Sequence, residues 1–107
     1  VERARRHIAD HYAEALELGD IAREAGITAP HLIRLFKEAM DTTPAAYLWR
    51  YRTSAAARLL RETGLSTAEV AYRTGFANPQ HFSRLFRQHH GLPPRAWRRR
   101  EWRTSTA

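Results

Sequence analysis

The sequence predicts an all-α protein of about seven helices, in which a long central helix joins two helix-turn-helix lobes in a homeodomain-like tandem. The first observation is an internal repeat, since residues 21–48 and 70–98 carry Ala, Gly, Pro, His and an Arg-Leu-Phe-basic string in the same order. The copies run at an offset of 49 residues up to their prolines and 50 after them. The second observation is that apolar residues recur three and four positions apart, which is the spacing of an amphipathic helix. No segment alternates apolar and polar residues with β-branched enrichment, as a strand does.

The first copy and the residues before it predict three helices. Residues 2–13 place apolar side chains at helical spacing and predict an opening helix. Residues 18–25 predict a second helix that ends at Gly26, because glycine adopts the left-handed conformation that other residues resist. Thr28 is placed to cap a third helix over roughly residues 29–40.

A long helix follows between the two copies. It begins at Thr43-Pro44, where Thr43 is the cap, and it runs to about Glu62. Proline is well tolerated at the first position of a helix, because an N–H at that position has no partner within the helix. At ~1.5 Å per residue this helix spans roughly 27 Å. Beyond it, Ser66 and Glu69 have the spacing of a capping box, in which each residue accepts a hydrogen bond from the backbone of the other.

The second copy repeats the same order of elements. Gly75 predicts the turn, Asn78-Pro79 begins a helix that Gly91 ends, and a last short helix contains Trp97. We therefore divide the chain into three parts. The first lobe covers 1–42, the linker helix covers 43–63, and the second lobe, with a C-terminal helix and a basic tail, covers 64–107. The aromatic residues on the apolar stripes are expected in the core, and they are Phe36, Phe76, Phe82, Phe86 and Trp97.

Charge and composition limit the function. Eighteen basic and eleven acidic residues give a net charge of +7, which predicts attraction to polyanions, with nucleic acid first and anionic membranes second. The absence of cysteine excludes disulfides, thiolate metal sites and cysteine nucleophiles. Neither the pair His7 and His11 nor the pair His89 and His90 has a third ligand nearby, and no catalytic motif occurs. We expect no enzyme activity, metal or cofactor.

The second helix of each copy has a polar outer face once its apolar stripe is buried. The first of these faces carries Pro30, Ile33, Arg34 and Lys37, and the second carries Pro79, Gln80, Ser83, Arg84 and Arg87. A helix fits the major groove of DNA, which is roughly 12 Å wide. There, arginine binds guanine through two hydrogen bonds, glutamine does the same with adenine, and isoleucine contacts a thymine methyl group. The two helices are therefore candidate recognition helices.

These residues give the chain a resemblance to the DNA-binding domain of the AraC/XylS family of bacterial transcription regulators. The resemblance covers about residues 3–100. In the first copy it rests on Ile21, Ala22, Gly26, Ile27, Thr28, Leu32, Arg34, Leu35, Phe36, Lys37, Thr43, Pro44, Tyr47 and Leu48. In the second copy it rests on Val70, Ala71, Gly75, Phe76, Phe82, Ser83, Arg84, Leu85, Phe86, Arg87, Gly91, Pro94, Trp97 and Arg98.

The resemblance implies sequence-specific binding of double-stranded DNA, with recognition helices over about 29–40 and 78–90 in successive major grooves. The residues that it places against bases are Pro30, Ile33, Arg34, Pro79, Gln80, Ser83 and Arg84. For phosphate contacts we expect Thr28, Lys37, Asn78 and Arg87, because helix starts present free N–H groups and basic side chains bind phosphate. Pro30 and Ile33 cannot donate hydrogen bonds to bases, so the first lobe depends on Arg34 for directional contacts.

The resemblance also implies RNA polymerase as a second partner, and a missing N-terminal segment that senses a ligand and dimerises. The isolated domain is expected to be monomeric. The chain begins on Val1 and is interpreted as a fragment of a cytoplasmic protein, since no signal peptide or membrane-spanning run occurs. Three alternatives remain: a nonspecific nucleic-acid binder (RNA included), a helical protein-docking module, and a membrane-active cationic tail over residues 95–103. Arg34 and Arg84 could also be structural, paired with acidic neighbours.

Overall fold

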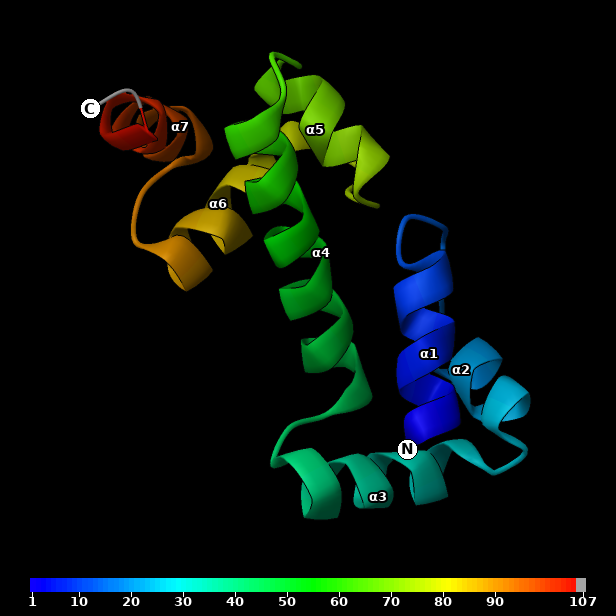
Figure 1. The fold of residues 1–107 in the computed structure, drawn as a ribbon. Coiled ribbons are helices and arrows are strands. Elements are labelled where there is room, and N and C mark those ends of the chain that lie inside the picture. Colours follow the sequence, from blue (N-terminus) through cyan, green and yellow to red (C-terminus); the bar gives the residue numbers. More distant parts are fainter. Residues whose placement is uncertain (106–107) are drawn as a thin grey trace. The chain divides into compact units, whose positions relative to one another are not determined.

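The computed structural model describes residues 1–105, and these residues contain seven α-helices and no strand (Figure 1). The helices are α1 (Glu2–His11), α2 (Leu18–Ala25), α3 (Ala29–Met40), α4 (Pro44–Glu62), α5 (Thr67–Arg73), α6 (Pro79–His90) and α7 (Pro94–Ser105). The predicted all-α class is confirmed. Two predicted lengths were wrong, because α1 ends two residues earlier than expected and α7 is a full 12-residue helix instead of a short one.

The chain forms two compact units, and the boundary between Tyr51 and Arg52 lies within α4. In the first unit α1 packs against α2, and α2 packs against α3. The core of this unit consists of Ala4, Ile8, Ile21, Ala22, Leu32, Phe36 and Leu48. In the second unit α5 packs against α6, and α6 against α7. Its buried apolar residues are Ala55, Ala56, Ala57, Leu60, Val70, Ala71, Phe76, Phe82, Phe86 and Trp97.

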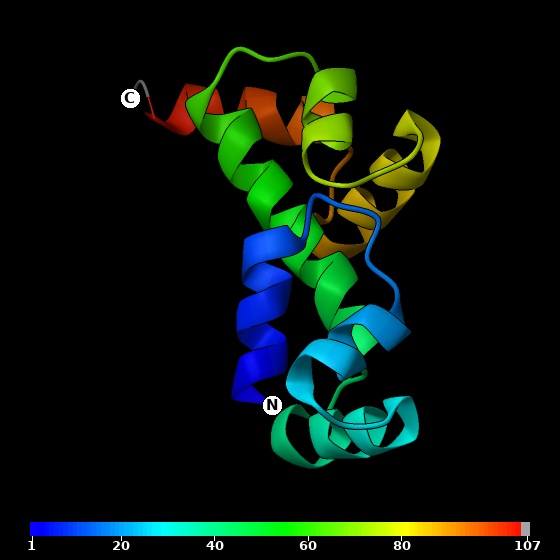
Figure 2. The same ribbon diagram turned by 90° about the vertical axis from the view of Figure 1, so that its right-hand side faces the viewer.

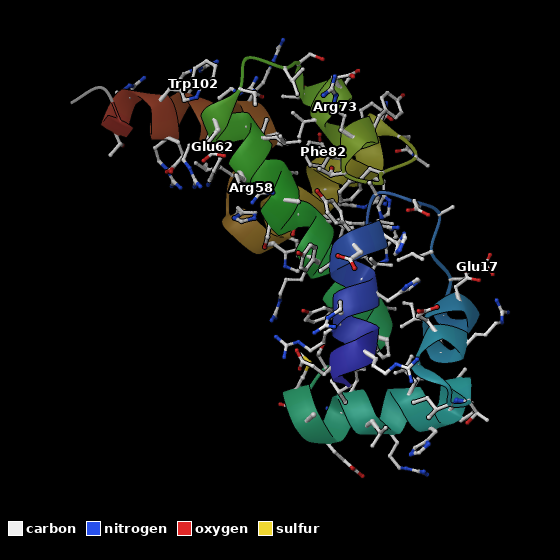
Figure 3. All side chains as sticks on the ribbon, turned by 45° about the vertical axis from the view of Figure 1, so that its right-hand side comes forward. Glu17, Arg58, Glu62, Arg73, Phe82 and Trp102 are labelled. Carbon is white, nitrogen blue, oxygen red and sulfur yellow. The ribbon has the colours of Figure 1, made fainter. Side chains whose placement is uncertain are left out.

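The predicted aromatic core is confirmed. Phe36, Phe76, Phe82 and Phe86 are at most 2% exposed, and Trp97 is 6% exposed. In the second unit the rings pack in a chain, with Phe82 and Phe86 5.6 Å apart between ring centroids and Phe86 and Trp97 5.4 Å apart. Figure 3 shows the Phe82 side chain directed into the interior of this unit. These residues hold α6 to its neighbours by one face, which leaves its opposite face free.

The turn between the two helices of each motif depends on a glycine with positive φ, namely Gly26 (75°) and Gly75 (95°). An L-residue with a Cβ resists this conformation, so the glycines allow the sharp change of direction. The residue after each glycine makes the same bond, since Ile27 N donates to Ala22 O at 3.1 Å and Phe76 N donates to Ala71 O at 3.0 Å. The two turns are thus equivalent up to this point.

The extra residue of the second copy is Ala77, in the turn. Thr28 caps α3 directly after Ile27, whereas Ala77 comes between Phe76 and the Asn78 cap of α6. The change of offset from 49 to 50 therefore occurs before the helix begins, and not at the prolines as the sequence had indicated. As a result Pro30 is equivalent to Gln80, not to Pro79.

Side-chain caps begin the helices as predicted, with one correction. Ser66 Oγ accepts a hydrogen bond from Glu69 N at 3.1 Å, but the Glu69 carboxylate accepts from Arg73 Nε at 2.9 Å and does not return to Ser66. The predicted capping box is therefore only half formed, because Arg73 lies one turn along the same helix face. A complete capping box forms instead at the start of α2, between Glu17 and Asp20.

The predicted basic tail is part of α7, which lies beside the C-terminal end of α4 within the second unit (Figure 2). Arg98 donates to the carbonyl oxygens of Leu60 at 2.8 Å and Thr63 at 3.1 Å. The indole N–H of Trp102 donates to the carbonyl oxygen of Arg61 at 2.9 Å, and Figure 3 shows Trp102 next to that helix end. Arg98 of this basic segment is therefore held within the fold. The last carbonyl oxygens of a helix have no N–H partner within it, and at the end of α4 the side chains of Arg98 and Trp102 donate the missing hydrogen bonds.

Candidate nucleic-acid interface

The outer face of α6 forms an open groove of about 520 Å³. It is lined by Pro79, Gln80, Ser83, Arg84, Arg87 and Pro93. All five residues that the sequence placed on this face line the same groove. Pro93 is an addition that sequence analysis missed, although its position directly before the proline that begins α7 could have indicated it. The groove has two guanidinium groups and no acidic side chain in its lining, so it favours an anionic ligand.

The two recognition helices expose equivalent positions. At the offset of 50, Leu32 and Phe82 are both buried, and so are Phe36 and Phe86 one turn later. Each helix begins with a side-chain cap and ends in a left-handed residue. The sequence repeat is therefore a structural repeat, and the outer face of α3 has the same construction as the groove face of α6.

The outer face of α3 carries different chemistry. Pro30, Ile33, Arg34 and Lys37 are all exposed, and Ile33 is 41% exposed although it is large and apolar. Lys37 Nζ lies 3.1 Å from Asp41 Oδ1, in an ion pair whose side chains are both largely solvent-accessible. Such a pair contributes only about 0–1 kcal/mol, so Lys37 can leave Asp41 for a phosphate at little cost.

Arg34 and Arg84 make no hydrogen bond or ion pair with any residue from 1 to 105. Both guanidinium groups are exposed on the outer faces of their helices. The alternative in which these arginines are held by acidic neighbours therefore has no support in the described chain. Their contact with DNA bases stays a prediction.

Thr28 and Asn78 act as helix caps. Thr28 Oγ1 accepts from His31 N at 3.3 Å, and Asn78 Oδ1 accepts from His81 N at 2.7 Å. Both caps are exposed beside the recognition faces. Their cap role is confirmed, whereas their contact with phosphate stays a prediction.

The histidine pairs do not form a metal site within residues 1–105. The rings of His7 and His11 lie 4.6 Å apart between centroids, and Glu14 Oε2 lies 2.6 Å from His11 Nδ1. That hydrogen bond raises the pKa of His11. No group of three or more His, Asp or Glu side chains in the described residues is arranged to hold a metal ion. In the same range, every helix is too short or too polar to cross a bilayer.

Two units that each hold a basic, solvent-facing helix against a supporting helix through a glycine turn define a tandem helix-turn-helix DNA-binding domain. The comparisons with known proteins agree. The helix-turn-helix domain family matches residues 21–100. The chain belongs to the AraC-type helix-turn-helix family of bacterial transcription regulators.

Relatives and solved structures support this assignment. The chain is 36% identical over 86 residues to the HTH-type transcriptional activator RhaS of Escherichia coli O139:H28, covering 80% of this chain and 31% of RhaS. A transcriptional regulator with an AraC-type DNA-binding domain from Chromobacterium violaceum matches with a TM-score of 0.89 and 31% identity, covering 94% of this chain and 89% of that one. The DNA-binding domain of the global transcriptional factor AdpA, solved in complex with a target DNA, matches with a TM-score of 0.87 and 28% identity, covering 91% and 87%.

Proposed function

We propose that this chain is the operator-reading part of a bacterial transcription regulator and that α3 and α6 enter successive major grooves of one DNA site. The observation that carries the proposal is the groove of α6, where the predicted contact residues surround the unpaired guanidinium of Arg84. The likeness to AdpA, a domain solved with its target DNA, supports it further.

The two helices differ in how they contact bases. On α6, Arg84 binds guanine through O6 and N7, Gln80 binds adenine, and Ser83 and Pro79 contact neighbouring base edges. On α3, Arg34 supplies the directional contact, while Ile33 and Pro30 offer apolar contact to thymine methyl groups. The first half-site is therefore rich in thymine contacts, and the second depends more on hydrogen bonds.

Phosphate contacts fix the register of both helices. We assign them to Thr28 and Lys37 on the first unit and to Asn78 and Arg87 on the second, because these residues lie at the start and along the edge of each recognition helix. We expect about six to ten phosphate contacts in total. A plot of log K against log[salt] should then be linear, with a slope of about −0.9 for each phosphate neutralised.

The whole protein extends beyond this chain in the relatives, since the chain spans 31% of RhaS. We propose that the full regulator acts in the cytoplasm, contacts RNA polymerase, and senses its signal and dimerises through another segment. The chain by itself binds DNA as a monomer and has no enzyme activity.

A binding-site selection from random duplexes, followed by footprinting, tests this function. Specific binding should survive a roughly thousandfold excess of unrelated duplex, and one bound monomer should protect two adjacent major grooves, about 34 Å apart. Protection of one groove per monomer would contradict the two-helix geometry. Loss of binding in competitor would identify a nonspecific nucleic-acid binder.

A further inference from the structure

A second hollow in the second unit carries positive charge but lies off the recognition face. It has a volume of about 490 Å³ and is lined by Ser66, Thr67, Ala68, Arg95, Arg98, Arg99 and Trp102. The cap and the first two residues of α5, all small, form one wall, and α7 supplies every charged group. We call this the α5–α7 groove. No acidic side chain lines it, so three cations face a shared space without a counter-charge.

The three arginines of the groove differ in their hydrogen bonding. Arg98 is held by the carbonyl oxygens of Leu60 and Thr63, and its guanidinium carbon lies 4.9 Å from the centre of the Trp102 ring. Arg95 and Arg99 are exposed and make no hydrogen bond or ion pair with any described residue. Arg98 therefore serves the fold, and Arg95 and Arg99 are available to a ligand.

The repeat shows that this charge is particular to the second unit. At the offset of 50, the residues equivalent to Arg95, Arg98 and Arg99 are Ala45, Leu48 and Trp49. The cap equivalent to Ser66 is the acidic Glu17, exposed at the start of α2. The first unit therefore folds with no cation at these positions, so the architecture of the unit does not require arginine at positions 95 and 99.

We propose that the α5–α7 groove binds phosphates of the operator backbone outside the major groove that α6 occupies. The inference rests on the proposed function, because it assigns a further contact to the same DNA. Hydroxyl groups together with guanidinium groups are the usual phosphate-binding set of DNA-binding proteins. An acidic segment of a protein partner is the competing occupant.

The path of α7 favours DNA over a protein partner. Pro93 lines the groove of α6, and Arg95 and Arg99 follow it along α7 at the α5–α7 groove. At 1.5 Å per residue, Arg99 lies about 9 Å along the helix from Pro93. On each strand, phosphates repeat about every 3.4 Å of the duplex axis, so a step of this length parallel to the axis corresponds to phosphates roughly two to three nucleotides further out. A strand held beside α6 can thus continue to the second groove.

The test compares salt dependence in matched variants. The measured quantity is the slope of log K against log[salt], to which each phosphate contact contributes about 0.9. Arg99→Gln should lower the magnitude of this slope by about 1, and Arg95→Gln/Arg99→Gln should lower it by about 2. Arg100→Gln is the control, because Arg100 is the next residue on α7, makes the same charge change, and lies outside the groove lining. Its slope should equal that of the wild type. Fluorescence anisotropy on a duplex that extends at least 10 base pairs beyond the site on both sides provides the measurement.

A second measurement locates the phosphates. Single phosphates of the duplex are replaced by uncharged methylphosphonates. At one or two positions outside the α6 half-site, this replacement should weaken DNA binding by the wild type. At the same positions it should not weaken binding by Arg95→Gln/Arg99→Gln. Equal slopes for Arg99→Gln and Arg100→Gln would overturn the proposal, and weaker binding of polyglutamate by Arg99→Gln alone would then assign the groove to an acidic protein. The salt slope can also be measured on nonspecific duplex, because phosphate contacts do not depend on sequence. If the chain showed no base preference, the proposed function would be wrong, but the slopes of the variants would still test the α5–α7 groove.

Discussion

Arg98 Nε donates to the carbonyl oxygen of Leu60 at 2.8 Å, which ties α7 to the end of α4 across 38 positions of sequence. Arg98 is partly buried, and its second bond, to Thr63 O, completes the cap. Burial lowers the pKa of Arg98, but a guanidinium stays protonated at neutral pH. A charged donor thus satisfies two carbonyls that would otherwise lack partners at a helix end.

Replacing Arg98 should therefore destabilise the second unit. We expect Arg98→Ala to lower the free energy of unfolding by about 1.5–3 kcal/mol, the usual contribution of hydrogen bonds to a charged group. Arg98→Lys should rescue little, because a single ammonium cannot reproduce the planar fork. Urea titrations provide the measurement. Arg99→Ala, exposed on the same helix, should change stability by less than about 0.5 kcal/mol, and an equal loss there would contradict the capping role.

Sequence patterns predicted the helices because the signals are local. Thr28, Ser66 and Asn78 cap their own helices, and the glycines act on their own turns, so each signal lies within a few residues of its effect. The contacts of Arg98 and Trp102 join segments 35 to 41 residues apart, and a row of arginines gives no local sign of its partners. The candidate nucleic-acid interface shows the same difference. Helical periodicity identified the outer faces of α3 and α6, but it could not identify the α5–α7 groove, because α5 and α7 form this groove only when they pack together.

The end of α6 offers a conformational test. Gly91 has φ of +83°, and a Cβ there would meet no atom within 4 Å, so any cost of substitution comes from backbone conformation alone. Gly91→Ala should reduce stability by about 1 kcal/mol, since the left-handed region disfavours residues with a Cβ. Gly64→Ala is the matched control, because Gly64 is equally open and is not at positive φ. It should be neutral or slightly stabilising. Equal effects in thermal melts would contradict the assigned conformation.

His90 makes the second unit sensitive to acid. Its ring stacks on Phe86 with centroids 4.4 Å apart, and its Nε2 is buried without a hydrogen-bond partner in the described residues. Burial lowers the pKa of His90, His89 lowers it further, and a hydrogen bond with the Thr53 backbone opposes the shift in part. The unfolded state therefore takes up a proton near pH 6.5 that the folded state resists.

The contribution of His90 to stability should accordingly be constant above about pH 6.5 and fall as pH decreases below it, toward the lower pKa of the folded state. His11 has a raised pKa and contributes with the opposite sign, so the wild type must be compared with a variant that leaves His11 unchanged. The difference in melting temperature between the wild type and His90→Gln should narrow or reverse between pH 7 and pH 5. His89→Gln removes the smaller of the two causes that lower the pKa of His90, so it should keep most of the acid-dependent fall in stability. A constant difference for His90→Gln would contradict the buried neutral imidazole.

Recognition and folding can be separated on α6, because Arg84 and Phe86 lie on opposite faces of one helix. Arg84 lines the outer groove, whereas Phe86 is fully buried against Trp97 and His90. Arg84→Ala should cost about 1–3 kcal/mol in binding to the selected operator and less in binding to scrambled duplex, because a base contact discriminates between sequences. It should leave the melting temperature nearly unchanged, since its guanidinium has no partner in the described chain.

Phe86→Ala should behave in the opposite way. The cavity it leaves should lower the free energy of unfolding by about 3–5 kcal/mol and weaken binding to every sequence alike, through loss of the folded second unit. Melting curves and titrations on operator and scrambled duplexes, made on both variants, distinguish the two effects. If Arg84→Ala lowered the melting temperature as much as Phe86→Ala and kept the preference for the operator, Arg84 would be a structural residue. The outer face of α6 would then not be the surface that contacts bases.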